Sequence, residues 1–254
     1  MPLDRRSFVT LGSVSLTAPV VEAALASSMF PRSIRAVAFD AFAIFDPRPI
    51  FAACEVAFPG RGAELANAWR VRQFEYQWLR ALTGMYANFW DVTVSALEFA
   101  AHSMKLDLSP GQRDQLMSGY LTLRAWPDVK EALSGLQRAG MQVALLSNAT
   151  EQILTAGIRD SDLLGAFQHV ISTDRIKTFK PDPRAYRLGT QIMRLHEKEI
   201  LFVAFAGWDV AGAGWFGYPT FWNNRQNATA EELNVRADGT GTTLTELLRL
   251  LHPR

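Results

Sequence analysis

The sequence has little of several features that mark special classes of protein. Its single cysteine, Cys54, excludes an internal disulfide and any metal cluster built from cysteine ligands. The histidines lack metal-ligand spacing, so we expect neither zinc nor haem; they are His102, His169, His196 and His252. A formal net charge of +1 gives no electrostatic reason to expect nucleic acid or an acidic membrane as a partner.

What is present is the composition of an ordinary globular protein. Hydrophobic residues make up 48% and charged residues 20% of the chain, which is enough apolar material to bury a core. A length of 254 residues allows one large domain, or a core that carries an inserted module. No internal repeat or low-complexity segment is found.

The first thirty residues differ from the rest of the chain. Arg5 and Arg6 precede a weakly apolar stretch that ends in the small-x-small sequence Ala24-Leu25-Ala26. This segment, residues 1–30, resembles a twin-arginine export signal cleaved after that sequence, and predicts a periplasmic or exported protein. Pro19 and Glu22 interrupt the stretch, which is too short to span a membrane, so the mature chain is not expected to bind one. The alternative is an amino-terminal arm or packing helix on a cytoplasmic protein.

After residue 31, strand and helix patterns can be separated. Ile34 to Phe39 is a short apolar run that predicts a buried strand. Residues 49–123 show only helical patterns, such as the large apolar side chains at helical spacing between Glu64 and Leu82. The pair Ser109-Pro110 is typical of a helix start, because a capping serine precedes proline at the first helical position.

The carboxyl-terminal half alternates short strands with helices. The predicted strands are 143–146, 169–172, 200–205 and 219–222, and the predicted helices are 128–139, 151–164, 183–195, 210–217 and 244–251. Strands separated by helices imply a parallel sheet with helices on both faces, so the predicted fold class is α/β. Residues 31–48 and 124–254 would form this core, and residues 49–123 an inserted helical cap.

Polar residues follow three of the predicted strands. Asp40 ends the first strand, Ser147 and Asn148 end the second, and the loop after residue 205 leads to Asp209. In open α/β sheets ligands bind outside the carboxyl ends of the strands, where these residues would meet. An acid in such a place is costly to keep charged unless it has a function. Lys180, which precedes a proline and a helix, is a fourth candidate for the predicted site.

Five segments resemble a known family. FDAF, LLSN, FKPDPRAY and FVAFAGWDVAGAGWFG together resemble the haloacid dehalogenase (HAD) superfamily. Within it, AFPGRGAELANAWRVRQFEYQWLRALTGMYANFW resembles the type II, L-2-haloacid dehalogenases. The resemblance covers residues 34–222. It implies a HAD-like Rossmannoid parallel sheet with an inserted α-helical cap, no cofactor, no metal, and a homodimer.

The resemblance also implies roles for particular residues. Asp40 would attack the halogen-bearing carbon of a short L-2-haloalkanoic acid, giving an aspartyl ester and free halide. Water would then cleave the ester and release a 2-hydroxy acid. Lys180 beside Asp40 and the acid Asp209 would complete the catalytic set. The implied binding residues are Arg70, Asn148 and Phe89 for the halide, Ser147 for the substrate carboxylate, Trp208 for the alkyl side, and Tyr186 beyond Lys180.

Each of these residues also has a purely structural interpretation. Ser147 and Asn148 could end a strand, and Asp209 could cap a helix that starts at Val210. Arg70 could belong to a solvated helix face and Lys180 to the surface. The aromatic candidates could be ordinary packing residues; they are Phe89, Tyr186 and Trp208.

The sequence departs from the family pattern at two places. Members of the family usually have a sequence like DxYGTLFD after the strand. This chain has DAFAIFD, which is one residue shorter and has Ile44 where the threonine is expected. The turn must therefore be rebuilt or strained. Ala204 and Ala206 replace a serine and an asparagine that hold the nucleophile and the hydrolytic water, and Phe205 lies between them. Because these losses affect water more than ester formation, we expect slow hydrolysis or loss of turnover.

Two other functions are open from the sequence. Phosphatases of the superfamily resemble D-x-D, but Phe42 occupies the position of the second acid, which favours a halocarbon over a phosphate ester. The second alternative is a catalytically weakened, exported relative that binds a small carboxylate or another anion. The shortened turn and the alanines at positions 204 and 206 favour it.

Overall fold

The structure is a computed structural model that describes Phe30 and residues 33–251. The predicted export segment therefore lies, apart from Phe30, outside the described residues, and export stays a prediction. Within the described part of the chain, none of the helices combines the length and apolarity needed to cross a bilayer.

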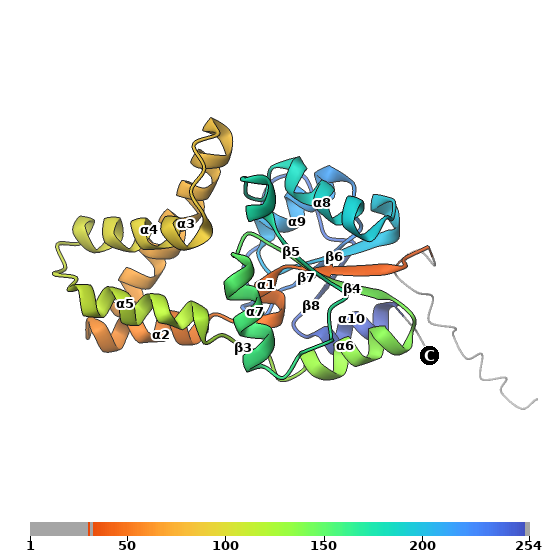
Figure 1. The fold of residues 1–254 in the computed structure, drawn as a ribbon, viewed down its shortest axis with the longest axis horizontal. Coiled ribbons are helices and arrows are strands. Elements are labelled where there is room, and N and C mark those ends of the chain that lie inside the picture. Colours follow the sequence, from red (N-terminus) through yellow and green to blue (C-terminus); the bar gives the residue numbers. More distant parts are fainter. Residues whose placement is uncertain (1–29, 31–32, 252–254) are drawn as a thin grey trace, which may run out of the picture.

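The core is a six-stranded parallel sheet, which confirms the predicted α/β class (Figure 1). Its strands, in spatial order, are β5 (His169–Ser172), β4 (Gln142–Ser147), β1 (Ala36–Phe39), β6 (Ile200–Ala204), β7 (Thr220–Asn223) and β8 (Gly239–Gly241). The register pairs Phe39 with Leu145 on one side and with Val203 on the other. The carboxyl ends of β1, β4 and β6 therefore lie side by side, so the residues that follow them meet.

Helices cover both faces of this sheet. One face carries α6 (Val129–Arg138), α7 (Glu151–Asp160) and α10 (Leu244–Leu251), and the other carries α8 (Pro183–Met193) and α9 (Gly207–Phe216). Side chains alternate along β1, with Val37 and Phe39 in the first core and Ala36 and Ala38 in the second. Burial on both faces explains why the strands are continuous apolar runs.

Residues 48–121 form helices at one end of the sheet, coloured from orange through yellow to yellow-green in Figure 1. The elements are α2 (Arg48–Ala57), α3 (Gly62–Thr83), α4 (Phe89–Ser103), α5 (Pro110–Ser118) and the 3-10 turn η1 (Gly119–Leu121). Helix α5 begins as predicted, with Ser109 in a capping box and Pro110 at the first position. We refer to residues 48–121 as the cap.

The chain enters and leaves the cap through two adjacent strands. β2 (Phe45–Asp46) pairs antiparallel with β3 (Arg124–Ala125). Contacts beyond these strands also join cap and core. The hydroxyl of Tyr86 donates to Asp174 at 2.7 Å, and the ring of Tyr86 lies 5.2 Å from that of Phe179, centroid to centroid. The cap is therefore held at both ends of its contact with the core.

The structure differs from the sequence prediction in its short elements. β2, β3 and β8 were not predicted, because two or three residues carry no readable pattern and β8 is Gly-Thr-Gly. The helix predicted to begin at Val210 begins at Gly207. The remaining short elements are α1 (Ala41–Ile44) and the 3-10 turns η2 (Thr173–Ile176) and η3 (Glu197–Glu199).

Candidate active site

Asp40 lies directly after the central strand β1 and begins a single helical turn, α1. Its Oδ1 accepts a hydrogen bond of 2.9 Å from the backbone N–H of Phe42, so Asp40 caps this turn. Its backbone angles are φ −59° and ψ 146°, and no described residue from 40 to 44 has a positive φ. Of the two outcomes open from the sequence, the shortened turn is rebuilt as a helix and not strained.

The carbonyl oxygens of this Asp40 turn (residues 40–44) are held by distant segments. The indole Nε1 of Trp126 donates to the Phe42 carbonyl at 3.1 Å, and the backbone N–H of Trp126 donates to the Ile44 carbonyl at 3.0 Å. Arg225 Nη2 reaches the Ala43 carbonyl at 3.4 Å. One helical turn cannot satisfy its own last carbonyls, so these donors stabilise the conformation that presents Asp40.

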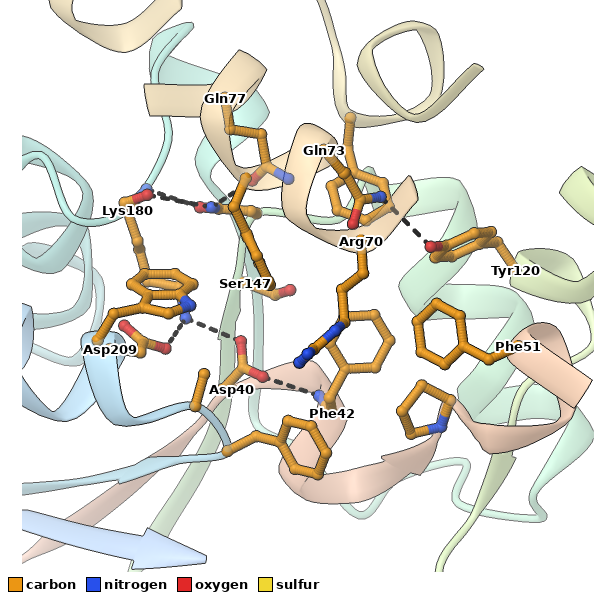
Figure 2. Close-up of a pocket in the computed structure, with 17 residues that line it drawn as sticks. Asp40, Phe42, Phe51, Arg70, Gln73, Gln77, Tyr120, Ser147, Lys180 and Asp209 are labelled. Atoms are coloured by element: carbon orange, nitrogen blue, oxygen red, sulfur yellow. Dashed lines mark hydrogen bonds and ion pairs between the residues drawn. The ribbon is translucent and has the colours of Figure 1, made fainter. Parts of the chain in front are cut away.

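A buried ammonium joins two carboxylates in the site (Figure 2). Lys180 Nζ lies 2.9 Å from Asp40 Oδ2 and 2.6 Å from Asp209 Oδ2. Tyr186 donates its hydroxyl to the other oxygen of Asp209 at 2.7 Å. Lys180, Asp209 and Tyr186 are buried, whereas Asp40 retains 13% side-chain exposure toward the cavity. Asp40 is therefore the carboxylate of the pair that a ligand can reach.

The charges of this group are coupled. Burial raises the pKa of Asp209 to about 6; Lys180 opposes this shift and the negative charge of Asp40 adds to it. Burial lowers the pKa of the Lys180 ammonium, but the two carboxylates outweigh this effect, so its pKa is raised. Burial and Asp209 raise the pKa of Tyr186 well above its ordinary value. At neutral pH Lys180 is thus charged and Tyr186 is a neutral donor.

Asn148 lies between core and cap. Its Oδ1 accepts from the backbone N–H of Lys180 at 2.7 Å and from the Thr173 hydroxyl at 3.3 Å. Its Nδ2 donates to Gln77 Oε1 on the cap helix α3 at 2.8 Å and to the Lys180 carbonyl at 3.3 Å. The neighbouring Ser147 Oγ accepts from the Ala149 N–H at 3.1 Å, which leaves its O–H group available as a donor.

These groups surround a cavity between cap and core. The space open to the centre of a water-sized sphere is about 50 Å³, room for a few waters or one small molecule. Besides the residues already placed there, its walls are mainly aromatic and apolar: Phe42, Pro47, Phe51, Phe74, Phe89, Tyr120, Phe205, Ala206 and Trp208. The cavity therefore suits a small, largely apolar ligand.

Arg70 adds a second positive charge to this cavity. It lies on α3, is exposed, and lines the cavity, and Figure 2 shows its side chain extending toward the side that holds Asp40. It has no ion-pair partner among the described residues. Phe89 is buried at the start of α4 and packs edge-on against Tyr120, with ring centroids 5.6 Å apart.

The structure brings together the residues predicted from the sequence, with two differences. Tyr186 does not line the cavity; it lies behind Asp209 and contacts the cavity group only through that acid. The interpretation of Asp209 as a helix cap is wrong, because α9 begins at Gly207 and its N-cap is Ala206, so Asp209 lies within the helix. Both oxygens of Asp209 are used by Lys180 and Tyr186 instead.

Sequence reasoning missed three polar residues. Gln73 and Gln77 follow Arg70 at helical spacing, so all three lie on the face of α3 that lines the cavity. That spacing was a readable signal. Trp126, which holds the Asp40 turn, carried none, because its role depends on the pairing of β2 with β3.

The two alanines of the last segment lie as follows. Ala204 is buried at the end of β6, and Ala206 lines the cavity. Between them, Phe205 lines the cavity with its ring centroid 6.2 Å from that of Phe42. The wall beside Asp40 is therefore apolar. No cluster of three or more His, Cys, Asp or Glu side chains suited to a metal occurs within residues 33–251.

Together, the sheet, the cap and the lysine-bound carboxylate at the end of the central strand define a capped α/β enzyme. The family model of haloacid dehalogenase-like hydrolases matches residues 14–217. The chain belongs to this family, within its L-2-haloacid dehalogenase branch.

The alignments with individual relatives cover nearly the whole length of each relative. Haloacetate dehalogenase H-2 of Moraxella sp. (strain B) is 37% identical over 221 residues, which is 87% of this chain and 99% of the relative. The (S)-2-haloacid dehalogenase of Pseudomonas sp. (strain YL) is 38% identical over 218 residues, 85% of this chain and 94% of the relative.

Solved structures show the same fold. A crystal structure of an L-2-haloacid dehalogenase has a TM-score of 0.83 at 37% identity, covering 86% of this chain and 98% of the other. The L-2-haloacid dehalogenase of Xanthobacter autotrophicus, also solved with chloropropionic acid covalently bound, has a TM-score of 0.78 at 33% identity. That comparison covers 85% of this chain and 98% of the other.

The role of Trp126 can be tested by Trp126→Phe, which removes the indole N–H but keeps an aromatic ring beneath Arg48 and Arg225. Losing the bond to the Phe42 carbonyl should lower the free energy of unfolding by about 1 kcal/mol. Urea denaturation measures this, with Trp215→Phe at an exposed site as the control. Equal stability of both variants would contradict the role.

The raised pKa of Asp209 predicts a pH dependence of stability. Because the folded-state pKa lies above the ordinary value of 3.8, the contribution is present below 3.8 and is lost as the pH rises through about 6. The difference in unfolding free energy between wild type and Asp209→Asn should therefore fall between pH 4 and pH 7, by up to about 3 kcal/mol. A pH-independent difference in chemical denaturation would contradict the shift.

Proposed function

We propose that this chain is a hydrolytic dehalogenase that acts on the carbon–halide bond of short L-2-haloalkanoic acids and releases halide and a 2-hydroxy acid. The observation that carries the proposal is the Asp40 carboxylate, held by Lys180 at 2.9 Å in a small, mainly apolar cavity. The names of the relatives support the substrate class. No separate observation favours a phosphate ester.

In the first step, one oxygen of Asp40 attacks C2 of the substrate. A new C–O bond forms while the carbon–halogen bond breaks, and the electron pair leaves with the halide. Lys180 supports this step because its ammonium holds the Asp40 carboxylate at 2.9 Å, and the Phe42 N–H orients it. Backside attack inverts the configuration at C2, so an L-2-haloacid gives a D-2-hydroxy acid.

Groups that face the cavity would bind the departing halide and the substrate carboxylate. The guanidinium of Arg70, which has no ion-pair partner within residues 33–251, can stabilise the charge that develops on the halide. Phe89 offers a weakly positive ring edge and keeps water away. The free O–H group of Ser147 can donate to the substrate carboxylate. Trp208 forms part of the apolar wall for the alkyl side.

In the second step, water attacks the ester carbonyl carbon, which is Cγ of Asp40, and the alkyl oxygen leaves as the hydroxyl of the product. Asp209 lies behind Asp40, where Lys180 and Tyr186 both donate hydrogen bonds to it. Ala206 and Phe205 give the wall beside Asp40 no polar side chain with which to orient water. We therefore propose that ester hydrolysis, and not its formation, limits turnover.

The chemistry is tested by halide release from L-2-chloropropionate without added metal. Wild type should release chloride and Asp40→Asn should not, because the amide is a poor nucleophile. Asp46→Asn is the matched control, since Asp46 pairs with Arg48 away from the cavity and should keep activity. Mass spectrometry of wild type after brief exposure should show the ester adduct.

Two outcomes would change the proposal. Chloride release that survives in Asp40→Asn would remove Asp40 from the reaction. Absence of release from wild type, combined with a rise in melting temperature on adding haloacid, would favour a weakened relative that only binds a small carboxylate.

We also propose that two copies of the chain associate through the cap. Several large apolar side chains of α3, α4 and the loop between them are exposed to solvent: Val71, Trp78, Leu79, Leu82, Met85 and Phe99. A cluster of this kind on a soluble surface is typical of an interface.

The association predicts a defined mutational effect. Leu82 is 86% exposed, and Leu82→Glu should convert the dimer into a monomer in analytical ultracentrifugation at micromolar concentration. Leu164→Glu, at a 76% exposed site on the core, should leave the dimer intact. A wild-type monomer at tens of micromolar would rule out the interface.

A further inference from the structure

The cap side of the cavity contains an amide whose donor is unused. Gln77 is 1% exposed and lines the cavity, and its Nε2 has no hydrogen-bond partner among the described residues. A buried N–H group without a partner costs free energy comparable to a lost hydrogen bond. Such a donor in a ligand cavity indicates that the ligand supplies the acceptor.

The orientation of this amide is set from the core. Asn148 Nδ2 donates to Gln77 Oε1 at 2.8 Å, which identifies the oxygen end and leaves Nε2 as the free end. Figure 2 shows Gln77 on the cap side of the cavity, opposite Asp40. Gln77 is thus held as a donor before any ligand arrives.

Asn148, by contrast, has no donor left. An amide nitrogen carries two hydrogens, and those of Asn148 are directed to Gln77 and to the Lys180 carbonyl. Its oxygen accepts from the Lys180 N–H and the Thr173 hydroxyl. The neighbouring cap residue Gln73 is also committed, since its Nε2 donates to Thr93 and Tyr120.

We infer that Gln77 is a neutral amide donor that binds the anionic ligand atom in this cavity, and that Asn148 orients it. The inference rests on the proposed function and refines its anion-binding part. The ligand class is a small monovalent anion: a halide ion or a carboxylate. Gln77 and Arg70 lie two turns apart on the same face of α3, so one helix supplies both a charge and a neutral donor.

The test measures anion binding without turnover. Bromide and, separately, acetate are titrated into the full chain and followed by tryptophan fluorescence, which reports on the cavity through Trp208 and Trp78. Gln77→Met removes the donor at similar volume and should weaken binding of at least one anion about tenfold or more. Loss with bromide alone assigns the donor to the leaving halide, and loss with acetate alone assigns it to the substrate carboxylate.

A double-mutant cycle separates the two amides. Asn148→Ala removes the donor that orients Gln77 without adding a charge, so it should weaken binding as well. The double variant should bind the anion no more weakly than the weaker-binding single variant does, because both changes remove the same donor. Gln152→Met, on α7 outside the cavity, is the control and should bind like wild type. Circular dichroism and melting temperature verify that each variant is folded.

The outcomes distinguish this inference from the proposed dehalogenation. Wild type that binds bromide but releases no halide from haloacids would overturn the proposed reaction and leave the assignment of Gln77 standing. Unchanged anion affinity in Gln77→Met, additive effects in the double variant, or no anion binding by wild type would overturn the assignment.

Discussion

The buried ammonium of Lys180 is the interaction on which the rest of the site depends. It lies within 3 Å of both Asp40, which follows β1, and Asp209, which lies in α9 after β6. A buried charge is tolerated only when it is paired and hydrogen-bonded, and two carboxylates around one ammonium meet that condition. The same arrangement leaves one excess negative charge, which Asp40 can present to a ligand while Asp209 remains buried.

The position of Asp40 is set by a rebuilt turn. After β1 the chain forms one helical turn whose amino end is capped by Asp40 itself. Trp126 and Arg225 donate hydrogen bonds to the carbonyls at the other end of the turn. Because Trp126 directly follows β3, at the exit from the cap, the turn, the cap linkers and the core strands are stabilised together.

The cap gives the cavity its chemical character. Helix α3 supplies Arg70 and Gln77, and aromatic side chains of cap and core form most of the remaining wall. The hydrogen bond between Gln77 and Asn148 joins cap and core across the cavity, so cap and core together position the amide of Gln77. Because the aromatic wall excludes water, each charge interaction inside the cavity is stronger.

Sequence alone determined the α/β class, the helical nature of residues 49–123, and the meeting of Asp40, Ser147 and Asp209, since the carboxyl ends of parallel strands share one edge. Those features follow from local apolar periodicity. Tertiary structure alone decided which polar groups are free. Gln77 and Asn148 are 71 residues apart, and Trp126 meets Phe42 across 84 residues. Hydrogen-bond partners of this kind depend on how distant segments pack, and no local pattern encodes them.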